Sequence, residues 1–322
     1  MAHQRRVILE WAGQGRIAPQ NLRAALELGA VLPTAEQWRR FLDRLLLFMG
    51  AVMLAASVIF FLAYNWQDLG RYTKFGLVQA LLLVALAFVW RLGLERVSGK
   101  AALLTAALLT GALLALVGQT YQTGADTYEL FAAWAVAILP WVVLARFPAL
   151  WILWLALVNL AVTLYFQAFG GWLGIVFGPE RQLWLLFGLN TAALLAWEAA
   201  AAAGVEWLHE RWPVRLIATA SGVLVTVLAV MAVFDSKYGV AWSVIAWLAW
   251  LGAAYAVYRR RIKDLYMLAG GVLSMIVVVT AFLGKHLIRG EAGGFLLIGL
   301  IVIGMSAAGS YWLKNVATEE ES

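Results

Sequence analysis

The sequence contains no cysteine, only three histidines and few charged residues. The lack of cysteine excludes disulfide frameworks, thiolate zinc sites and cysteine nucleophiles. His3, His209 and His286 are far apart in polar segments, so the zinc helix with two histidines four residues apart is absent. The sequence also lacks a phosphate-binding loop, a Gly-x-Ser-x-Gly elbow and paired intramembrane aspartates. We therefore predict no metal or cofactor, and an enzyme is the less favoured class of protein.

Charged residues make up 13% of the chain and apolar residues 64%, whereas about a quarter of a soluble domain is charged. Each apolar run is close to the length of roughly 20 residues that crosses about 30 Å of hydrocarbon as a helix. The sequence therefore predicts an all-α fold, a polytopic transmembrane helix bundle of about ten spans. The expected spans are 45–64, 75–90, 101–120, 128–144, 150–168, 183–203, 216–234, 240–258, 265–283 and 295–313.

The polar N-terminal segment carries no short apolar stretch with a cleavage site, so we do not expect a cleaved signal peptide. Residues 3–13 and 19–28 are predicted to form two short amphipathic helices. Thr34 is the expected N-cap of a third helix, because Gln37 follows it at the spacing of a capping box. The predicted organisation is a cytoplasmic amphipathic helical segment (1–43), the transmembrane bundle (44–314) and an acidic cytoplasmic tail (315–322).

The basic residues are distributed unevenly when the ten spans are threaded with a cytoplasmic N-terminus. Eighteen of the 24 then lie on the cytoplasmic side, and the others are Arg71, Lys74, Arg181, Lys237, Lys285 and Arg289. By the positive-inside rule both termini are predicted to be cytoplasmic in a bacterial inner membrane. The net charge of +6 therefore indicates membrane orientation, and nucleic acid is not an expected partner.

Polar side chains gather in three places on the predicted outer side. The candidate pocket residues there are Asn65, Trp66, Lys74, Gln119, Tyr121, Gln122, Asp126, Glu129, Lys285 and His286, and Arg289 and Glu291 follow the last two. If their spans are neighbours, these clusters frame one outward-facing pocket whose cations suit an anionic group. The alternatives are structural: Asp126 caps the fourth span by binding the Glu129 amide, Asp68 pairs with Arg71 or Lys74 at the interface, and the third cluster is a solvated loop.

We further expect Gln119, Tyr121, Gln122 and Asp126 to face the protein interior and to meet Asn65 or Trp66. Polar groups that face lipid would lose hydrogen bonds at a cost of about 1 to 3 kcal/mol each.

Four polar residues lie within the apolar runs: Gln79, Asn159, Asn190 and Glu198. Asn159 and Asn190 are predicted to bridge helices through side-chain hydrogen bonds. Glu198 is a functional candidate because it is an intramembrane carboxylate, although its position near the cytoplasmic end also lets it reach the membrane surface. Gly304 and Ala308 predict a close helix contact in the last span.

The segment Gly118–Asp126, followed by Leu130, Phe131 and Trp134 and closed by Leu139–Pro140, resembles a bacterial membrane family catalogued as domain of unknown function twenty-one fifty-seven. Gly15–Ile17, and Asn65–Trp66 before Lys74, are similar to the opening pattern of that family. The resemblance covers roughly the first 145 residues. It implies a polytopic inner-membrane protein and supplies no activity, substrate or cofactor.

Three functions fit these features. The first is a transporter of a small solute or lipid precursor, which a cavity reaching the middle of the bilayer would favour. The second is a non-catalytic envelope accessory or sensor protein whose N-terminal segment binds a cytoplasmic protein partner, although such a segment also suits anionic lipid. The third is a membrane-embedded transferase that uses outer carboxylates such as Asp68, Asp126 and Glu129. The expected partners are the lipid bilayer and a small solute or lipid-linked substrate.

Overall fold

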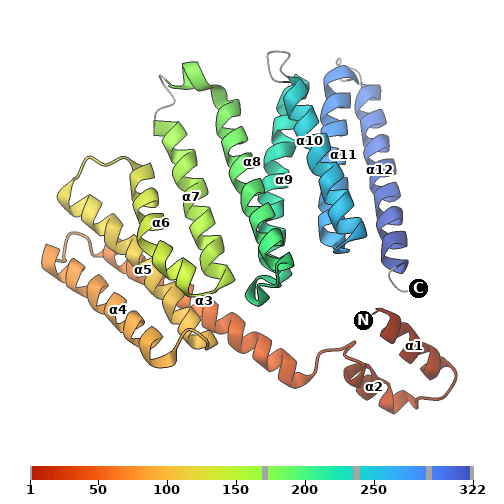
Figure 1. The fold of residues 1–322 in the computed structure, drawn as a ribbon, viewed down its shortest axis with the longest axis horizontal. Helices are drawn as coiled ribbons and strands as arrows, with labels where there is room; N and C mark the ends of the chain where they lie inside the picture. The colour runs from red at the N-terminus through yellow and green to blue at the C-terminus, as the bar shows by residue number, and fades with distance from the viewer. Residues whose placement is uncertain (1, 169–172, 235–239, 288–291, 320–322) are drawn as a thin grey trace. The chain divides into compact units, whose positions relative to one another are not determined.

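The computed structural model describes residues 2–168, 173–234, 240–287 and 292–319 (Figure 1). In this part of the chain all regular elements are helices, and ten of them are long and apolar enough to cross a membrane. The predicted all-α fold with ten spans is therefore confirmed. The helices form two compact units, Met1–Gly124 and Ala125–Glu320, and each is described by itself.

The N-terminal helices are α1 (Ala2–Gly13), the 3-10 helix η1 (Pro19–Asn21) and α2 (Leu22–Leu28), which confirms the two predicted short helices. Ile8 is buried against the end of α2, where a Cβ atom on Gly29 would lie 2.5 Å from its Cδ1 atom. The predicted capping box is also confirmed. The Thr34 hydroxyl accepts a hydrogen bond from the Gln37 amide, and the Gln37 side chain accepts one from the Thr34 amide.

The spans of the first unit are α3 (Ala35–Tyr64), α4 (Arg71–Leu92) and α5 (Val97–Tyr121). Helix α5 packs against both others, and its many alanine and glycine residues allow this close approach. The buried core joins Val58 of α3, Val78 of α4 and Leu109 of α5. The chain turns so tightly between α4 and α5 that a Cβ atom on Gly99 would lie 1.9 Å from the carbonyl oxygen of Gly93.

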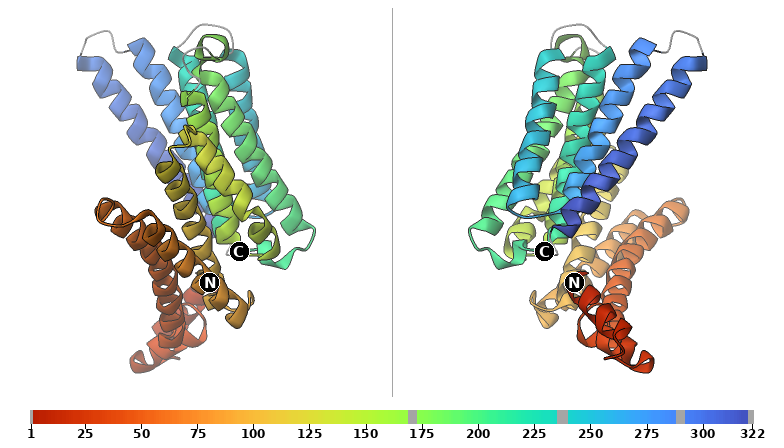
Figure 2. Two further views of the ribbon diagram at one scale, coloured as in Figure 1. Left: turned by 90° about the vertical axis from the view of Figure 1, so that its left-hand side faces the viewer. Right: turned by 90° about the vertical axis from the view of Figure 1, so that its right-hand side faces the viewer.

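The second unit contains seven long helices, and Figure 2 shows them from two sides. Helix α9 packs against α8, α10 and α11, and α6, α7 and α12 extend the unit at its two edges (Figure 1). The central position of α9 makes it one of the most buried of the described spans. The bounds are α6 (Thr127–Leu144), α7 (Pro148–Ala168), α8 (Leu173–Ala202), α9 (Arg211–Phe234), α10 (Val240–Arg260), α11 (Leu265–Leu287) and α12 (Ala292–Thr318), with η2 (Glu206–Leu208) before α9.

The predicted bridge between Asn159 and Asn190 is confirmed, and it joins α7 to α8. The Asn190 amide donates to Asn159 at 2.6 Å, and Asn159 donates in return at 3.3 Å. Each amide nitrogen also donates to a carbonyl of its own helix at 2.8 Å. Asn190 is 1% exposed, so its amide is satisfied inside the unit.

The predicted close contact at Gly304 in the last span is wrong. A Cβ atom on Gly304 would meet nothing within 4 Å, whereas one on Gly309 would lie 2.5 Å from Cγ1 of Val272 in α11. The physical reason is helical phase, since the two glycines face different directions on α12. The small-residue pattern therefore predicted a close contact in the correct helix at the wrong position.

Candidate functional site

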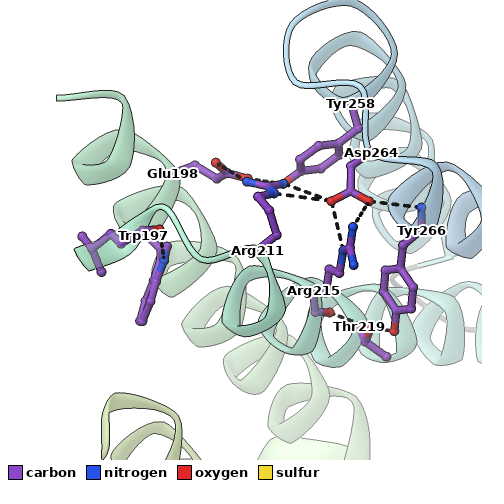
Figure 3. Close-up of polar contacts among 9 residues, drawn as sticks. Trp197, Glu198, Arg211, Arg215, Thr219, Tyr258, Asp264 and Tyr266 are labelled. Carbon is purple, nitrogen blue, oxygen red and sulfur yellow. Dashed lines mark hydrogen bonds and ion pairs between the residues drawn. The ribbon is translucent and has the colours of Figure 1, made fainter. Parts of the chain in front are cut away.

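Two arginines and two carboxylates meet where α8, α9, α10 and α11 come together (Figure 3). Arg211 donates to both oxygens of Glu198, at 3.0 and 3.2 Å, and to Asp264 at 3.4 Å. Arg215 donates to the two oxygens of Asp264 at 3.2 Å each. We call Glu198, Arg211, Arg215, Tyr258 and Asp264 the ion-pair cluster.

The ion-pair cluster is built mainly by helix ends. Glu198 lies near the end of α8, Arg211 opens α9, and Asp264 directly precedes α11, where its carboxylate also accepts the Tyr266 amide at 3.1 Å. That bond caps α11. Tyr258, near the end of α10, donates its hydroxyl to Glu198 at 2.9 Å. The cluster carries two positive and two negative charges, so its groups compensate one another.

Glu198 is therefore bound by Arg211 and Tyr258 and is not an isolated carboxylate. Its side chain is 17% exposed and that of Asp264 is 3% exposed, so both carboxylates depend on their arginines for compensation. The cluster joins four helices at one end of the unit.

Away from the cluster, hydroxyl and indole groups connect α9, α10 and α11. The Trp247 indole donates to Ser274 at 2.8 Å, Ser274 and Thr226 share a hydrogen bond of 2.6 Å, and Thr226 donates to the Gly222 carbonyl. Near the cluster, Tyr266 and Thr219 share a hydrogen bond of 2.9 Å, and Thr219 donates to the Arg215 carbonyl. Each of these two series of hydrogen bonds ends at a backbone carbonyl, so the hydroxyl groups are satisfied without a ligand.

The same helices enclose a groove of about 500 Å³ between α9 and α11. This volume lies within the usual range for ligand pockets. Val223 and Leu273 are 56% and 62% exposed, so the groove is open along one side. Residues of its wall include Thr219, Val223, Tyr266, Gly270, Leu273 and Val277.

The groove begins beside the ion-pair cluster and ends near the middle of α11. Tyr266 lies at its first end, and the guanidinium carbon of Arg215 lies 5.5 Å from the centre of the Tyr266 ring. From Tyr266 to Val277 the helix advances about 16 Å at 1.5 Å per residue, which is about half of a hydrocarbon core of about 30 Å. The groove is thus about as long as one leaflet is thick, and one of its ends is polar.

The predicted outer residues of the first unit are partly brought together. Lys74 is buried at 7% exposure, and its Nζ atom lies 3.7 Å from the centre of the Trp66 ring. Asn65 donates to the Phe61 carbonyl of its own helix at 2.9 Å. Asp68 is exposed and, among the described residues, forms no ion pair with Arg71 or Lys74. The predicted Asp68 pairing is therefore wrong in this structure.

The expectation that four of these residues face the interior stays a prediction, because they lie on both sides of the boundary between the two units. Gln119, Tyr121, Gln122 and Asp126 are exposed, and Tyr121 contacts Phe75 and Arg71 of α4, with ring centres 6.0 Å apart for Phe75. Gln119 and Tyr121 lie in the last turn of α5, and Gln122 and Asp126 lie in the connection to α6.

Asp126 is the N-cap residue of α6, but its side chain makes no capping hydrogen bond. The Glu129 amide donates instead to the backbone carbonyl of Asp126 at 3.0 Å. The proposed side-chain cap is therefore wrong. Glu129 accepts a hydrogen bond from the Tyr128 hydroxyl at 3.3 Å.

Lys285 and His286 are exposed at the end of α11. Lys285 donates to the Val233 carbonyl of α9, and the His286 ring lies against Phe282 with ring centres 4.4 Å apart. Arg289 and Glu291 lie outside the described residues. The single outward-facing pocket draws on both units and stays a prediction.

Sequence reasoning missed Arg211 and Tyr258 as partners of Glu198, and it missed Asp264 as the second carboxylate that Arg211 binds. One signal was present: Asp264 is the lone acid after the basic run Arg259–Lys263, and Arg211 and Arg215 are four residues apart. Side chains four residues apart lie on one helix face, so a carboxylate bound by both arginines could have been sought. The groove itself left no sequence signal, because its wall residues are ordinary membrane residues.

Comparisons with known proteins bear on the first part of the chain. No curated protein and no solved structure matches this chain at a significant level. Residues 9–151 match the model of the family described as "Predicted membrane protein (DUF2157)", and this confirms the family resemblance found in the sequence.

Proposed function

We propose that the protein binds a membrane amphiphile, a lipid or a lipid-linked precursor, in the groove between α9 and α11. The observation that carries this proposal is that the polar side chains lining the groove form hydrogen bonds with one another. Thr219 binds Tyr266 and Thr226 binds Ser274, so the surface left for a ligand is mostly apolar. An acyl chain fits that surface, whereas a polar solute would lose its hydrogen bonds to water there.

The polar end of the groove suits a headgroup. The Arg215 side chain is 44% exposed beside Tyr266, and its Nε and Nη2 atoms are engaged by Asp264. A guanidinium has five N–H donors, so donors remain for a phosphate or another anionic group. An amphiphile would thus place its headgroup at Arg215 and its chain toward Val277.

This proposal selects among the three functions named from the sequence. A groove that reaches the middle of α11 favours the handling of a lipid precursor, and transport is the form of handling that we propose. The transferase named from the sequence uses Asp68, Asp126 and Glu129, and none of these lines the groove, so the groove does not support it. The accessory function, with a cytoplasmic protein partner at α1 and α2, stays a prediction.

The proposed setting is the bacterial inner membrane with both termini in the cytoplasm. In that orientation the ion-pair cluster lies on the cytoplasmic side, because it contains Arg211 and Arg215 and because the basic run Arg259–Lys263 directly precedes Asp264. The groove would then open to the inner leaflet. The substrate would be taken from lipid on the side where lipid precursors are made.

The test compares two glycine variants of the purified protein. Gly270 lines the groove, and Gly252 lies on α10 outside it, and a Cβ atom on either would meet nothing within 4 Å. Gly270→Leu fills the groove, whereas Gly252→Leu adds the same side chain elsewhere. Lipid extracted from the proteins after purification is quantified by mass spectrometry. We expect Gly270→Leu to lose most of the lipid that the wild type and Gly252→Leu retain. Equal amounts of co-purified lipid in all three proteins would refute the proposal. Co-purification of a protein segment instead of lipid would also refute it.

A further inference from the structure

The polar end of the groove between α9 and α11 is the place where a ligand meets charge. Among the described residues that line the groove, none is charged. Arg215 precedes the lining residue Thr219 by about one helical turn, and the Thr219 hydroxyl donates to the Arg215 carbonyl at 2.7 Å. The Arg215 guanidinium lies against the ring of Tyr266, a second lining residue (Figure 3). The guanidinium of Arg215 is therefore a charged group directly beside the apolar lining.

This guanidinium is fixed along one edge and open along the other. Its Nε and Nη2 atoms donate to different oxygens of Asp264 at 3.2 Å each. A guanidinium has five N–H donors in a planar fork, and two are used, so three are left unused by the described residues. These three belong to Nη1 and Nη2 and form a second edge, which matches two oxygens of a phosphate. The Arg215 side chain is 44% exposed, so a ligand can reach this edge.

The carboxylates of the ion-pair cluster are already occupied. Asp264 is 3% exposed and accepts hydrogen bonds from Arg211 and Arg215. Glu198 is 17% exposed and accepts hydrogen bonds from Arg211 and from the Tyr258 hydroxyl. The cluster therefore holds its negative charges inside and presents positive charge outward. An ammonium group of a ligand would meet an exposed guanidinium there, and none of the described carboxylates of the cluster is free to bind it.

We propose that the groove selects an anionic phospholipid and that Arg215 determines this specificity. The inference rests on the proposed function, because it names the class of amphiphile that the same groove holds. The lipid phosphate accepts two parallel hydrogen bonds from the open edge of the guanidinium. A zwitterionic phospholipid offers the same phosphate, but its ammonium group has no partner at the cluster. A neutral diacylglycerol fills the apolar groove and leaves the open edge without an acceptor.

The experiment uses the purified full chain, freed of lipid in a nonionic detergent. The protein is equilibrated with equal amounts of phosphatidylglycerol, phosphatidylcholine and diacylglycerol that carry the same acyl chains. The retained lipids are then quantified by mass spectrometry. Each protein is compared with its own Gly270→Leu form, in which the groove is filled, and the difference between the two is the lipid held in the groove.

Three variants separate charge, geometry and general electrostatics. Arg215→Gln removes both the charge and the open edge. Arg215→Lys keeps a cation for Asp264 but lacks the planar pair of donors. Arg261→Gln is the matched control, because Arg261 is an exposed arginine that follows α10 and does not line the groove.

We expect the wild type and Arg261→Gln to prefer phosphatidylglycerol over diacylglycerol by at least about tenfold, the value of one charge-assisted hydrogen bond. The preference over phosphatidylcholine should be smaller, because repulsion between exposed charges is weak. Arg215→Gln should lose both preferences, and Arg215→Lys should show intermediate ratios. A purely structural role of Arg215 would lower all three lipids together and leave their ratios unchanged. If Arg215→Gln does not fold, Arg215→Lys keeps the test decisive.

The failure of this inference differs from the failure of the proposed function. If the Gly270→Leu form retains as much of every lipid as the wild type, no lipid occupies the groove and both are refuted. If the groove holds lipid without preference for phosphatidylglycerol, or if the Arg215 variants keep the wild-type ratios, only the specificity is overturned. Inorganic phosphate, added at constant ionic strength, should displace little phosphatidylglycerol because it has no acyl chain. Its displacement of the lipid would identify the free anion as the ligand of Arg215 and would also overturn the inference.

Discussion

Asp264 receives two hydrogen bonds from Arg215 across the contact between α9 and α11, each of 3.2 Å. Asp264 also accepts the Tyr266 amide at the start of α11. The same carboxylate therefore closes an ion pair and caps a helix. The groove begins beside this contact, so the position of Asp264 fixes its polar end.

Replacing Asp264 by alanine should destabilise the protein by about 3 kcal/mol. This is the lower end of the range for breaking a buried ion pair, because Arg211 and Arg215 are partly exposed and water screens them. Asp264→Asn should cost less, since asparagine caps a helix about as well as aspartate. Unfolding in sodium dodecyl sulfate, followed by circular dichroism, measures both. Wild-type stability in the alanine variant would contradict the assigned role.

The Asn159–Asn190 bridge predicts a non-additive result. Asn190→Ala leaves Asn159 without its partner inside the unit, and we expect a loss of about 1 to 2 kcal/mol. In the double alanine variant no amide remains unpaired, so its loss should be smaller than the sum of the two single losses. The same unfolding assay, applied to the wild type, the two single variants and the double variant, gives the four stabilities of a double-mutant cycle. Strictly additive losses would show that the two side chains do not interact.

Two glycines should respond in opposite ways to alanine. A Cβ atom on Gly222 would lie 2.8 Å from the Trp250 ring, whereas one on Gly252 would meet nothing within 4 Å. Alanine favours a helix over glycine by up to about 1 kcal/mol. Gly252→Ala should therefore be neutral or stabilising, and Gly222→Ala should lower the melting temperature of the purified protein. A rise for Gly222→Ala would show that α9 and α10 are less closely packed than described.

The predicted orientation places the loop after Lys263 in the cytoplasm and the loop at Gly124 outside it. Fusions of a reporter that works only in the periplasm should be active after Gly124 and inactive after Lys263. The physical reason is the cost of moving many basic residues across the membrane. Activity after Lys263 would reverse the orientation and place the groove in the outer leaflet.

The sequence was a good guide wherever local rules act. Apolar run length predicted the ten spans, and the spacing of Thr34 and Gln37 predicted the capping box. The Asn159–Asn190 bridge was also predicted, because few partners exist for an amide within apolar helices. These features depend on neighbours along the chain or on a scarcity of alternatives.

Features that depend on helix adjacency and phase were not predicted. Glu198 and Asp264 are 66 positions apart in the chain, and only the packing of α8 and α11 around α9 brings them to the same arginine. The enclosure expected for Gln119 and Asp126 stays a prediction, because the two residues belong to different units. The groove arises from small residues on two facing helices, and composition alone does not reveal which faces meet.

The most direct test of lipid binding places a photoreactive amino acid in the groove. Leu273 lines it, and Leu248 is an exposed residue of α10 that does not, with 62% and 54% exposure. Each variant is purified in detergent, so that loosely bound lipid is removed, and is then irradiated and analysed by mass spectrometry. We predict a lipid adduct at position 273 and little or none at position 248. Equal labelling at the two positions, or no lipid adduct at 273, would contradict the assignment of the α9–α11 groove as a lipid site.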